Sequence, residues 1–387
     1  MKSTGFDEVS LLSLSSGDYS PIKGLVEDLI DYCATKNVSV SLPSLRLDGF
    51  ADEIPRNLER IRAGGLTFAP EAGTERLRRA INKPIEDATI LRTITSAMSR
   101  HWENCKLYFM VGLPSETDED ILGITELSLR IRRELTSQGW RRGTLHISIG
   151  TFCPKPHTPY QWCGQIPDSE IRRRIEMIRS ALRHRRIKLS THDTEPSILE
   201  AILSRGNIQL SSVIEAAFHA GCRFDEWSEC FQWERWLEAF AQSDLHPSAL
   251  AEKTYEREDL LPWSVVDCGL NPQYLWHEHV RTFNNRVSLH CGHRQCRACG
   301  VCDTETVFTV RAPLRDSGPE TPRDVDTGGT FRYRLKYEKQ GASAWLSHRI
   351  SLAQSTPRSA GHMSIWCSHK AIIRIRKSST QEPWQWA

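Results

Sequence analysis

The sequence predicts an α/β fold in which parallel strands form a partial, TIM-like (β/α) barrel. Short apolar runs alternate with stretches of helical spacing from residue 9 to residue 203, and right-handed crossovers between such units give a parallel sheet covered by helices. Within Gly65–Asp120, two apolar runs end in acid-bearing turns and pass directly into helices. No glycine fingerprint for dinucleotide phosphates follows the first run, which disfavours a Rossmann domain.

The individual elements follow from periodicity. Strands are expected where short apolar runs rich in β-branched residues occur, at Val9–Leu14, Val38–Leu42, Leu66–Ala69, Lys106–Val111, Leu145–Phe152 and Lys188–Thr191. Helices are expected where apolar residues recur at helical spacing, at Pro21–Thr35, Arg56–Arg62, Thr74–Asn82, Glu86–Arg100, Asp118–Leu135, Ser169–Arg185 and Ser197–Leu203.

From Ile208 the pattern changes to a small helical lobe. Helices are expected at Ser211–Ala220 and Trp233–Gln242, followed by an irregular stretch. The tryptophans of this region are interpreted as closing the core of the lobe, because nothing in their spacing indicates an aromatic ligand site. They are Trp227, Trp233, Trp236, Trp263 and Trp276.

Composition narrows the class of protein. The 387 residues include 50 basic and 48 acidic ones, so the near-balanced charge gives no clear nucleic-acid signal. No apolar run reaches the roughly 18–20 residues that a membrane span needs, and the first residues lack the features of a signal peptide. We therefore expect a cytoplasmic protein, in which the 12 cysteines bind metal or stay as thiols.

Four cysteines lie close together near the end of the lobe. Residues 288–303 read SLHCGHRQCRACGVCD, which places Cys291, Cys296, Cys299 and Cys302 at the spacing C-x4-C-x2-C-x2-C. Two linked C-x2-C steps let thiolates converge on one metal ion or cluster. The compact spacing favours an iron–sulfur cluster over structural zinc, although spacing alone leaves both open. The other cysteines are scattered singly and are interpreted as buried or incidental thiols.

Three strand-turn segments, LSLSSGDYS, FAPEAGTERLRRAINK and LYFMVGLPSETDED, resemble the radical S-adenosylmethionine (radical SAM) superfamily. They are most similar to the subgroup whose members carry an N-terminal cobalamin-binding domain. The likeness covers about Phe6–Cys302, and the segment FRYRLKYEKQGASAWLSHRISLAQ after it resembles the start of a domain that accompanies these proteins. Members use a [4Fe–4S] cluster and S-adenosylmethionine to make a 5′-deoxyadenosyl radical, so the resemblance implies an enzyme.

The resemblance also implies site residues. Ser16, Gly17 and Asp18 match the turn that contacts the methionine amino group of S-adenosylmethionine. Glu71 matches the carboxylate after the fourth barrel strand that helps to hold this cofactor, and Gly112 and Leu113 match the turn along its adenine.

Helix capping is the alternative role for two of these acids. Asp18 and Glu71 would then only cap the helices that follow them, and we keep that interpretation for Glu116 and for Asp118–Asp120. His157, His192 and Asp193 follow barrel strands on the side where active sites form, and they are candidates for substrate contact.

The chain departs from the family at one point that decides the mechanism. The family holds its cluster with a C-x3-C-x2-C triad, and no such spacing occurs among the 12 cysteines. We therefore expect a fragment of a longer protein, with the triad and the cobalamin domain on a preceding or separately encoded part. The alternative function is a non-catalytic iron–sulfur or zinc protein, or an inactive remnant.

The expected domains follow this order. They are a partial radical SAM barrel at 1–205, the helical lobe at 206–287, the cysteine segment at 288–303, a linker at 304–328, the start of the accompanying domain at 329–353 and a tail at 354–387. The tail lacks sustained periodicity, which indicates either disorder or a shifted reading frame.

Overall fold

The computed structural model describes residues 8–10, 22–34, 38–41, 65–98, 104–289, 296–302, 331–333 and 373–375. Its strands are β1 (Glu8–Ser10), β2 (Ser39–Ser41), β3 (Gly65–Glu71), β4 (Asn104–Val111), β5 (Thr144–Thr151), β6 (Ile187–Thr191), β7 (Phe331–Tyr333) and β8 (Ile373–Ile375). Its helices are α1 (Ile22–Ala34), α3 (Glu75–Ala80), α4 (Asp87–Met98), α5 (Asp118–Ser137), α6 (Asp168–Ala181), α7 (Thr194–Arg205), α8 (Leu210–His219), α9 (Trp233–Gln242), α10 (Pro247–Ala251) and α11 (Pro272–Phe283).

The main sheet confirms the predicted α/β class. Strands β3, β4, β5 and β6 lie in sequence order in one open sheet, and every neighbouring pair is parallel. Strands β1 and β2 form a separate parallel pair, while β7 and β8 pair antiparallel. Four parallel strands joined by helices are compatible with a partial (β/α) barrel. The predicted helix at Arg56–Arg62 lies outside the described residues.

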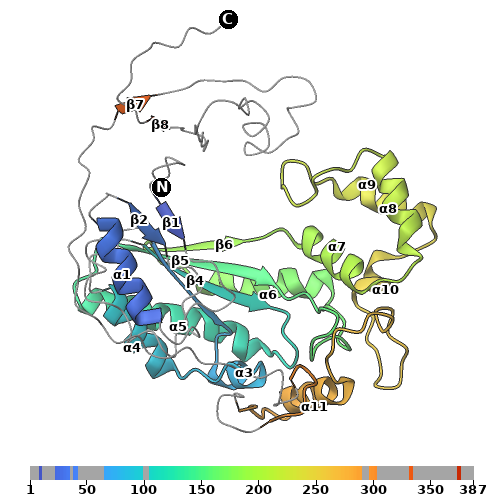
Figure 1. Cartoon of the computed structure of the whole chain (residues 1–387), viewed down its shortest axis with the longest axis horizontal. Coiled ribbons are helices and arrows are strands. Elements are labelled where there is room, and N and C mark those ends of the chain that lie inside the picture. The colour runs from blue at the N-terminus through green and yellow to red at the C-terminus, as the bar shows by residue number, and fades with distance from the viewer. Residues whose placement is uncertain are drawn as a thin grey trace, which may run out of the picture.

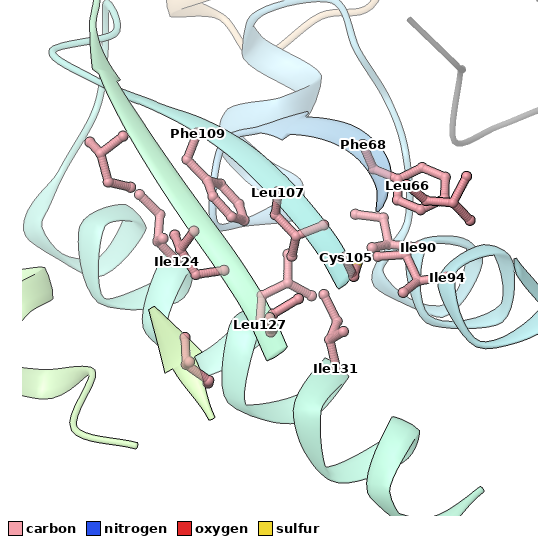
Figure 2. Packing of buried hydrophobic residues seen from close by; sticks show 14 of the residues in the cluster. Leu66, Phe68, Ile90, Ile94, Cys105, Leu107, Phe109, Ile124, Leu127 and Ile131 are labelled. Carbon is pink, nitrogen blue, oxygen red and sulfur yellow. The ribbon is translucent and has the colours of Figure 1, made fainter. Parts of the chain in front are cut away.

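One face of this sheet packs against helices α4, α5 and α6, which lie alongside it in Figure 1. Residues alternate along β4, so that Cys105, Leu107, Phe109 and Val111 are buried and the residues between them are not. Figure 2 shows Cys105, Leu107 and Phe109 meeting apolar side chains of α4 and α5. These buried side chains form the main apolar core. Burying each large aliphatic side chain contributes about 1.5–3 kcal/mol to the free energy of unfolding.

The chain after β6 is helical through α11 in the described residues. A second apolar cluster joins α7, α8, α9 and α10, and α8 and α9 stand apart from the sheet at the right of Figure 1. Trp236 and Trp263 are buried, and Trp233 and Trp276 pack against apolar clusters. Trp227 is 53% exposed, so its predicted place in the core is wrong. It lies between α8 and α9, in a turn where its N–H donates to the carbonyl of Phe224.

Candidate functional site

The carboxyl ends of β3, β4, β5 and β6 meet at one edge of the sheet, because the four strands are parallel and adjacent. This edge is where (β/α) barrels place their catalytic and binding residues. Glu71 ends β3, and Gly112 and Leu113 follow β4 directly. The structure therefore brings these three predicted residues to neighbouring strand ends, while Ser16, Gly17 and Asp18 lie outside the described residues.

Glu71 is positioned by an irregularity in β3. The register between β3 and β4 shifts between Phe68 and Glu71, and Glu71 pairs opposite Phe109 with a φ of 70°. Lys83, in the turn after α3, places its ammonium Nζ 3.2 Å from Glu71 Oε1 and also donates to the carbonyl of Ala69. The Glu71 carboxylate is 26% exposed and can still accept hydrogen bonds from a ligand.

Glu71 is not the cap of the following helix. The N-cap of α3 is Thr74, whose hydroxyl accepts from the backbone N–H of Leu77 at 3.2 Å. The capping alternative for Glu71 is therefore wrong, because Glu71 lies before the cap and pairs with Lys83 instead. Lys83 was missed in the sequence because its partner lies 12 residues away, although a lysine directly after a short helix was a usable signal.

The turn after β4 is held by a buried carboxylate. Gly112 has a φ of +94°, which favours glycine, and its N–H donates to Glu116 Oε2 at 2.7 Å. Arg174 of α6 reaches the same oxygen at 2.6 Å, and the Glu116 side chain is only 1% exposed. The capping interpretation of Glu116 is therefore wrong. Its side chain points back to Gly112 and across to α6, which fixes the turn of Gly112 and Leu113.

The true cap of α5 is a capping box formed by Thr117 and Asp120. Asp120 accepts from the Thr117 N–H at 2.8 Å and also binds the Thr74 hydroxyl and the Arg76 guanidinium. Burial opposes ionisation of Asp120, but these hydrogen bonds outweigh it and hold the pKa of Asp120 below its usual value. The capping interpretation is thus confirmed for Asp120, which also ties α3 to α5.

The pKa of Glu116 makes the stability of this turn depend on pH. Burial raises the pKa of Glu116 from 4.5 to about 7, although the bonds from Gly112 and Arg174 favour the ionised form. A raised pKa means that ionisation opposes folding, so the stabilising contribution is full below pH 4.5 and is lost as the pH approaches 7.

We therefore expect Glu116→Gln to flatten this dependence. Relative to the variant, the natural chain should lose up to about 3 kcal/mol of unfolding free energy between pH 4.5 and pH 8. Urea unfolding across this pH range measures the difference. A difference that stays constant with pH would contradict the raised pKa.

Comparison with known proteins gives a family match that includes β3, β4 and the turns that follow them. Residues 2–128 match the Radical SAM superfamily. An uncharacterized protein of Methanocaldococcus jannaschii is 35% identical over 209 residues, which are 54% of this chain. The chain spans only 44% of the length of that relative. The structure of dihydrodipicolinate synthase from Oceanobacillus iheyensis aligns with 74% of this chain and 98% of its own chain, at 10% sequence identity. The TM-score of 0.21 is too low to indicate a shared fold.

The Radical SAM match contains all six candidate cofactor residues, from Ser16 to Leu113, and ends before His157, His192 and Asp193. His157 follows β5 with a φ of 57°, and its N–H donates to Gln161 Oε1 at 3.1 Å. His192 and Asp193 are exposed after β6, and Asp193 is the N-cap residue of α7 without a side-chain cap bond. No hydrogen bond within the described chain links these three residues to Glu71, so their contact with a substrate stays a prediction.

The cysteine segment is held against the start of α11. The backbone N–H of Asn271 donates to the carbonyl of Cys299 at 2.7 Å, and Gly300 has a φ of +91° where an added Cβ would lie 2.6 Å from the carbonyl oxygen of Gly269. The N–H of Ala298 donates to Cys296 Sγ at 3.3 Å. Cys291 lies outside the described residues, and among the described ones no three Cys, His, Asp or Glu side chains are placed to hold a metal ion.

The first residue of this segment contacts the turn after α3. The backbone N–H of Ser288 donates to Asn82 Oδ1 at 2.9 Å, and Asn82 is next to Lys83. The Ser288 hydroxyl is in turn bonded to Glu278 and Arg281 of α11. The chain leaving α11 is thus attached to the turn that carries the partner of Glu71.

The single cysteines behave as scattered thiols. Cys33, Cys105 and Cys222 are buried, and burial raises the pKa of the Cys105 thiol to about 12. Within the described chain, no helix is both long and apolar enough to cross a membrane.

Proposed function

We propose that this chain is part of a radical SAM enzyme and supplies the wall of the active site that binds S-adenosylmethionine. The observation that carries the proposal is the placement of Glu71, Gly112 and Leu113 at the carboxyl ends of β3 and β4, within the segment that matches the Radical SAM superfamily. When bound, S-adenosylmethionine and a [4Fe–4S] cluster supply radical chemistry in this superfamily.

The cofactor fits the residues at this edge. The partly exposed Glu71 carboxylate can accept a hydrogen bond from the ammonium group of methionine, and its ion pair with Lys83 holds it in place. Glu116 and Arg174 hold the Gly112 turn, whose backbone would lie along the adenine ring, and the Ile166 side chain packs where a Cβ of Gly112 would stand. These residues bind and orient the cofactor.

The cluster does not fit this chain. The C-x3-C-x2-C spacing is absent from residues 1–387, so these residues do not supply the ligands by which the family holds its cluster. We propose that the three thiolates come from a separate or preceding part of the protein, on which cobalamin could also bind. Consistent with this proposal, the chain alone should form no 5′-deoxyadenosine under reduction, and its formation would overturn the proposal.

Binding of S-adenosylmethionine tests the site directly. Titration calorimetry of the full chain should show binding that is weakened at least about tenfold by Glu71→Gln, because a charged hydrogen bond contributes about 1.5–3 kcal/mol. Glu119→Gln is the matched control, since Glu119 is an exposed acid in the first turn of α5. Equal binding by the Glu71 variant, or no binding to the natural chain at millimolar cofactor, would contradict the proposal.

A second function is favoured by the cysteine segment. The N–H of Ala298 donates to Cys296 Sγ and Gly300 follows at positive φ, so a backbone donor is already directed at the sulfur of a prospective metal ligand. Iron, sulfide and zinc assays after anaerobic reconstitution distinguish an iron–sulfur cluster from zinc. Replacing Cys296 and Cys299 with Ala should remove the metal, and a Cys268→Ala control, at an exposed single cysteine, should keep it.

A further inference from the structure

The face of the main sheet that α4, α5 and α6 leave uncovered carries a row of basic side chains. In the strand register, Lys106 of β4 lies opposite His146 of β5, and His146 lies opposite Lys188 of β6. We call Lys106, His146 and Lys188 the basic row. Their neighbours along each strand, such as Cys105 and Leu145, are buried against the helices, so the basic row belongs to the other face.

A second row of hydroxyl side chains lies one step nearer the carboxyl edge. Tyr108 is opposite Ser148, and Ser148 is opposite Ser190, on the same face as the basic row. We call these three residues the hydroxyl row. The two rows are joined where the Lys106 ammonium donates to the Tyr108 hydroxyl at 2.7 Å.

This face concentrates positive charge. Neither the basic row nor the hydroxyl row contains a carboxylate. Among the described residues, neither Lys106 nor Lys188 has an ion-pair partner. The charges affect one another, since burial and then the nearby Lys188 and Lys106 lower the pKa of His146.

Such a row is costly in the free chain. The two lysines stand on either side of His146 and disfavour its protonated form, whereas barrel interiors are ordinarily filled by apolar side chains. A bound anion would offset this cost, because it would accept hydrogen bonds from both ammonium groups, from the imidazole and from the hydroxyls.

We propose that the basic row and the hydroxyl row bind a phosphoryl group of the substrate. Adjacent strands lie about 4.8 Å apart, so the backbones at Lys106 and Lys188 are about 10 Å apart and their long side chains can close on one phosphoryl group from both sides. A phosphoryl group suits this set because it carries up to two charges and three acceptor oxygens.

The position of the rows also sets the shape of the substrate. From Tyr108 to Gly112 is four residues along an extended strand, or about 13 Å. A substrate bound by its phosphoryl group and reacting at the carboxyl edge is therefore elongated. This assignment of a substrate class rests on the proposed function, whereas the anion site itself rests only on the sheet.

Inorganic phosphate is the probe for the test, which uses the full chain at low ionic strength. Phosphate should bind, and the double variant Lys106→Met/Lys188→Met should weaken binding at least about tenfold. The charge-matched control is Arg133→Met/Arg179→Met, because both arginines are exposed on the outer helices α5 and α6. It should bind phosphate as the natural chain does. Tyr108→Phe, which keeps the ring, should weaken binding by a smaller factor.

The readouts separate the alternatives. Phosphate should raise the pKa of His146, as followed by imidazole NMR, and the lysine double variant should lose that response. Equal weakening by the arginine control, or no phosphate binding, would overturn the proposal.

Two rival ligands are tested in the same way. Tighter binding of succinate than of phosphate would assign the site to carboxylates, and binding of single-stranded oligonucleotides alone would assign it to nucleic acid; both outcomes overturn the proposal. S-adenosylmethionine titrations run in parallel test the proposed function independently, since neither probe requires the cluster.

Discussion

Replacing Arg78 with Met is expected to lower the free energy of unfolding by about 3–5 kcal/mol. The Arg78 side chain is fully buried and forms an ion pair with Asp87 at the start of α4. Its Nε donates to the carbonyl of Ile85 at 2.7 Å, and its Nη1 donates to the carbonyl of Ala72 at 3.0 Å. The methionine would fill the space but leave these buried acceptors without their donor.

The neighbouring arginine supplies the control. Arg79 is exposed on the same short helix, so Arg79→Met should change the free energy of unfolding by no more than about 0.5 kcal/mol. Urea unfolding followed by circular dichroism compares the two variants at equal net charge. Similar small losses for both would show that the buried arginine contributes little. Because Ala72 follows Glu71 directly, the Arg78 variant should also weaken binding of S-adenosylmethionine.

Replacing Gly73 with Ala is expected to cost about 3 kcal/mol or more. A Cβ at position 73 would lie 2.2 Å from the backbone nitrogen of Ile124 and 2.5 Å from the carbonyl oxygen of Asp120. Both atoms belong to the backbone of α5, which cannot rotate away as a side chain could, so the helix must move. Overpacking of this kind costs typically 1–3 kcal/mol and occasionally more.

Gly150→Ala is the comparison for this variant. Gly150 lies within β5, and a Cβ there would meet no atom within 4 Å. The substitution should be nearly neutral, since alanine also reduces the freedom of the unfolded chain. Thermal unfolding of both variants measures the contrast. A Gly73 variant as stable as the Gly150 variant would mean that the turn after β3 does not touch α5 as described.

The order of the elements could be predicted from the sequence because local periodicity decides it. Helix α9 has the predicted bounds, Trp233–Gln242, and the strands β3 to β6 were all expected, since apolar side chains recur at the spacing of each element. Parallel pairing followed from the alternation of strands and helices.

The side-chain contacts of the site could not be predicted, because they join distant residues. Arg174 reaches Glu116 across 58 residues, and only the folding of α6 against the turn after β4 brings them together. The position of Glu116 just before α5 therefore suggested a helix cap, although its carboxylate is bonded to Gly112 and Arg174 instead. The basic row was visible in part: the alternation in NCKLYFMV places Lys106 and Tyr108 on one face, but the register to His146 and Lys188 required the sheet.

The attachment of Ser288 to Asn82 has a thermodynamic consequence for metal binding. Asn82 and Asn271 hold the chain on either side of the first two cysteines of the segment, through Ser288 and the carbonyl of Cys299. A loop whose ends are already fixed loses less conformational entropy when its thiolates gather on an ion. Any metal bound there would therefore also hold the loop end that contacts the residue next to Lys83. By linkage, the affinity for metal and the affinity for a ligand of Glu71 would then depend on one another to the same degree.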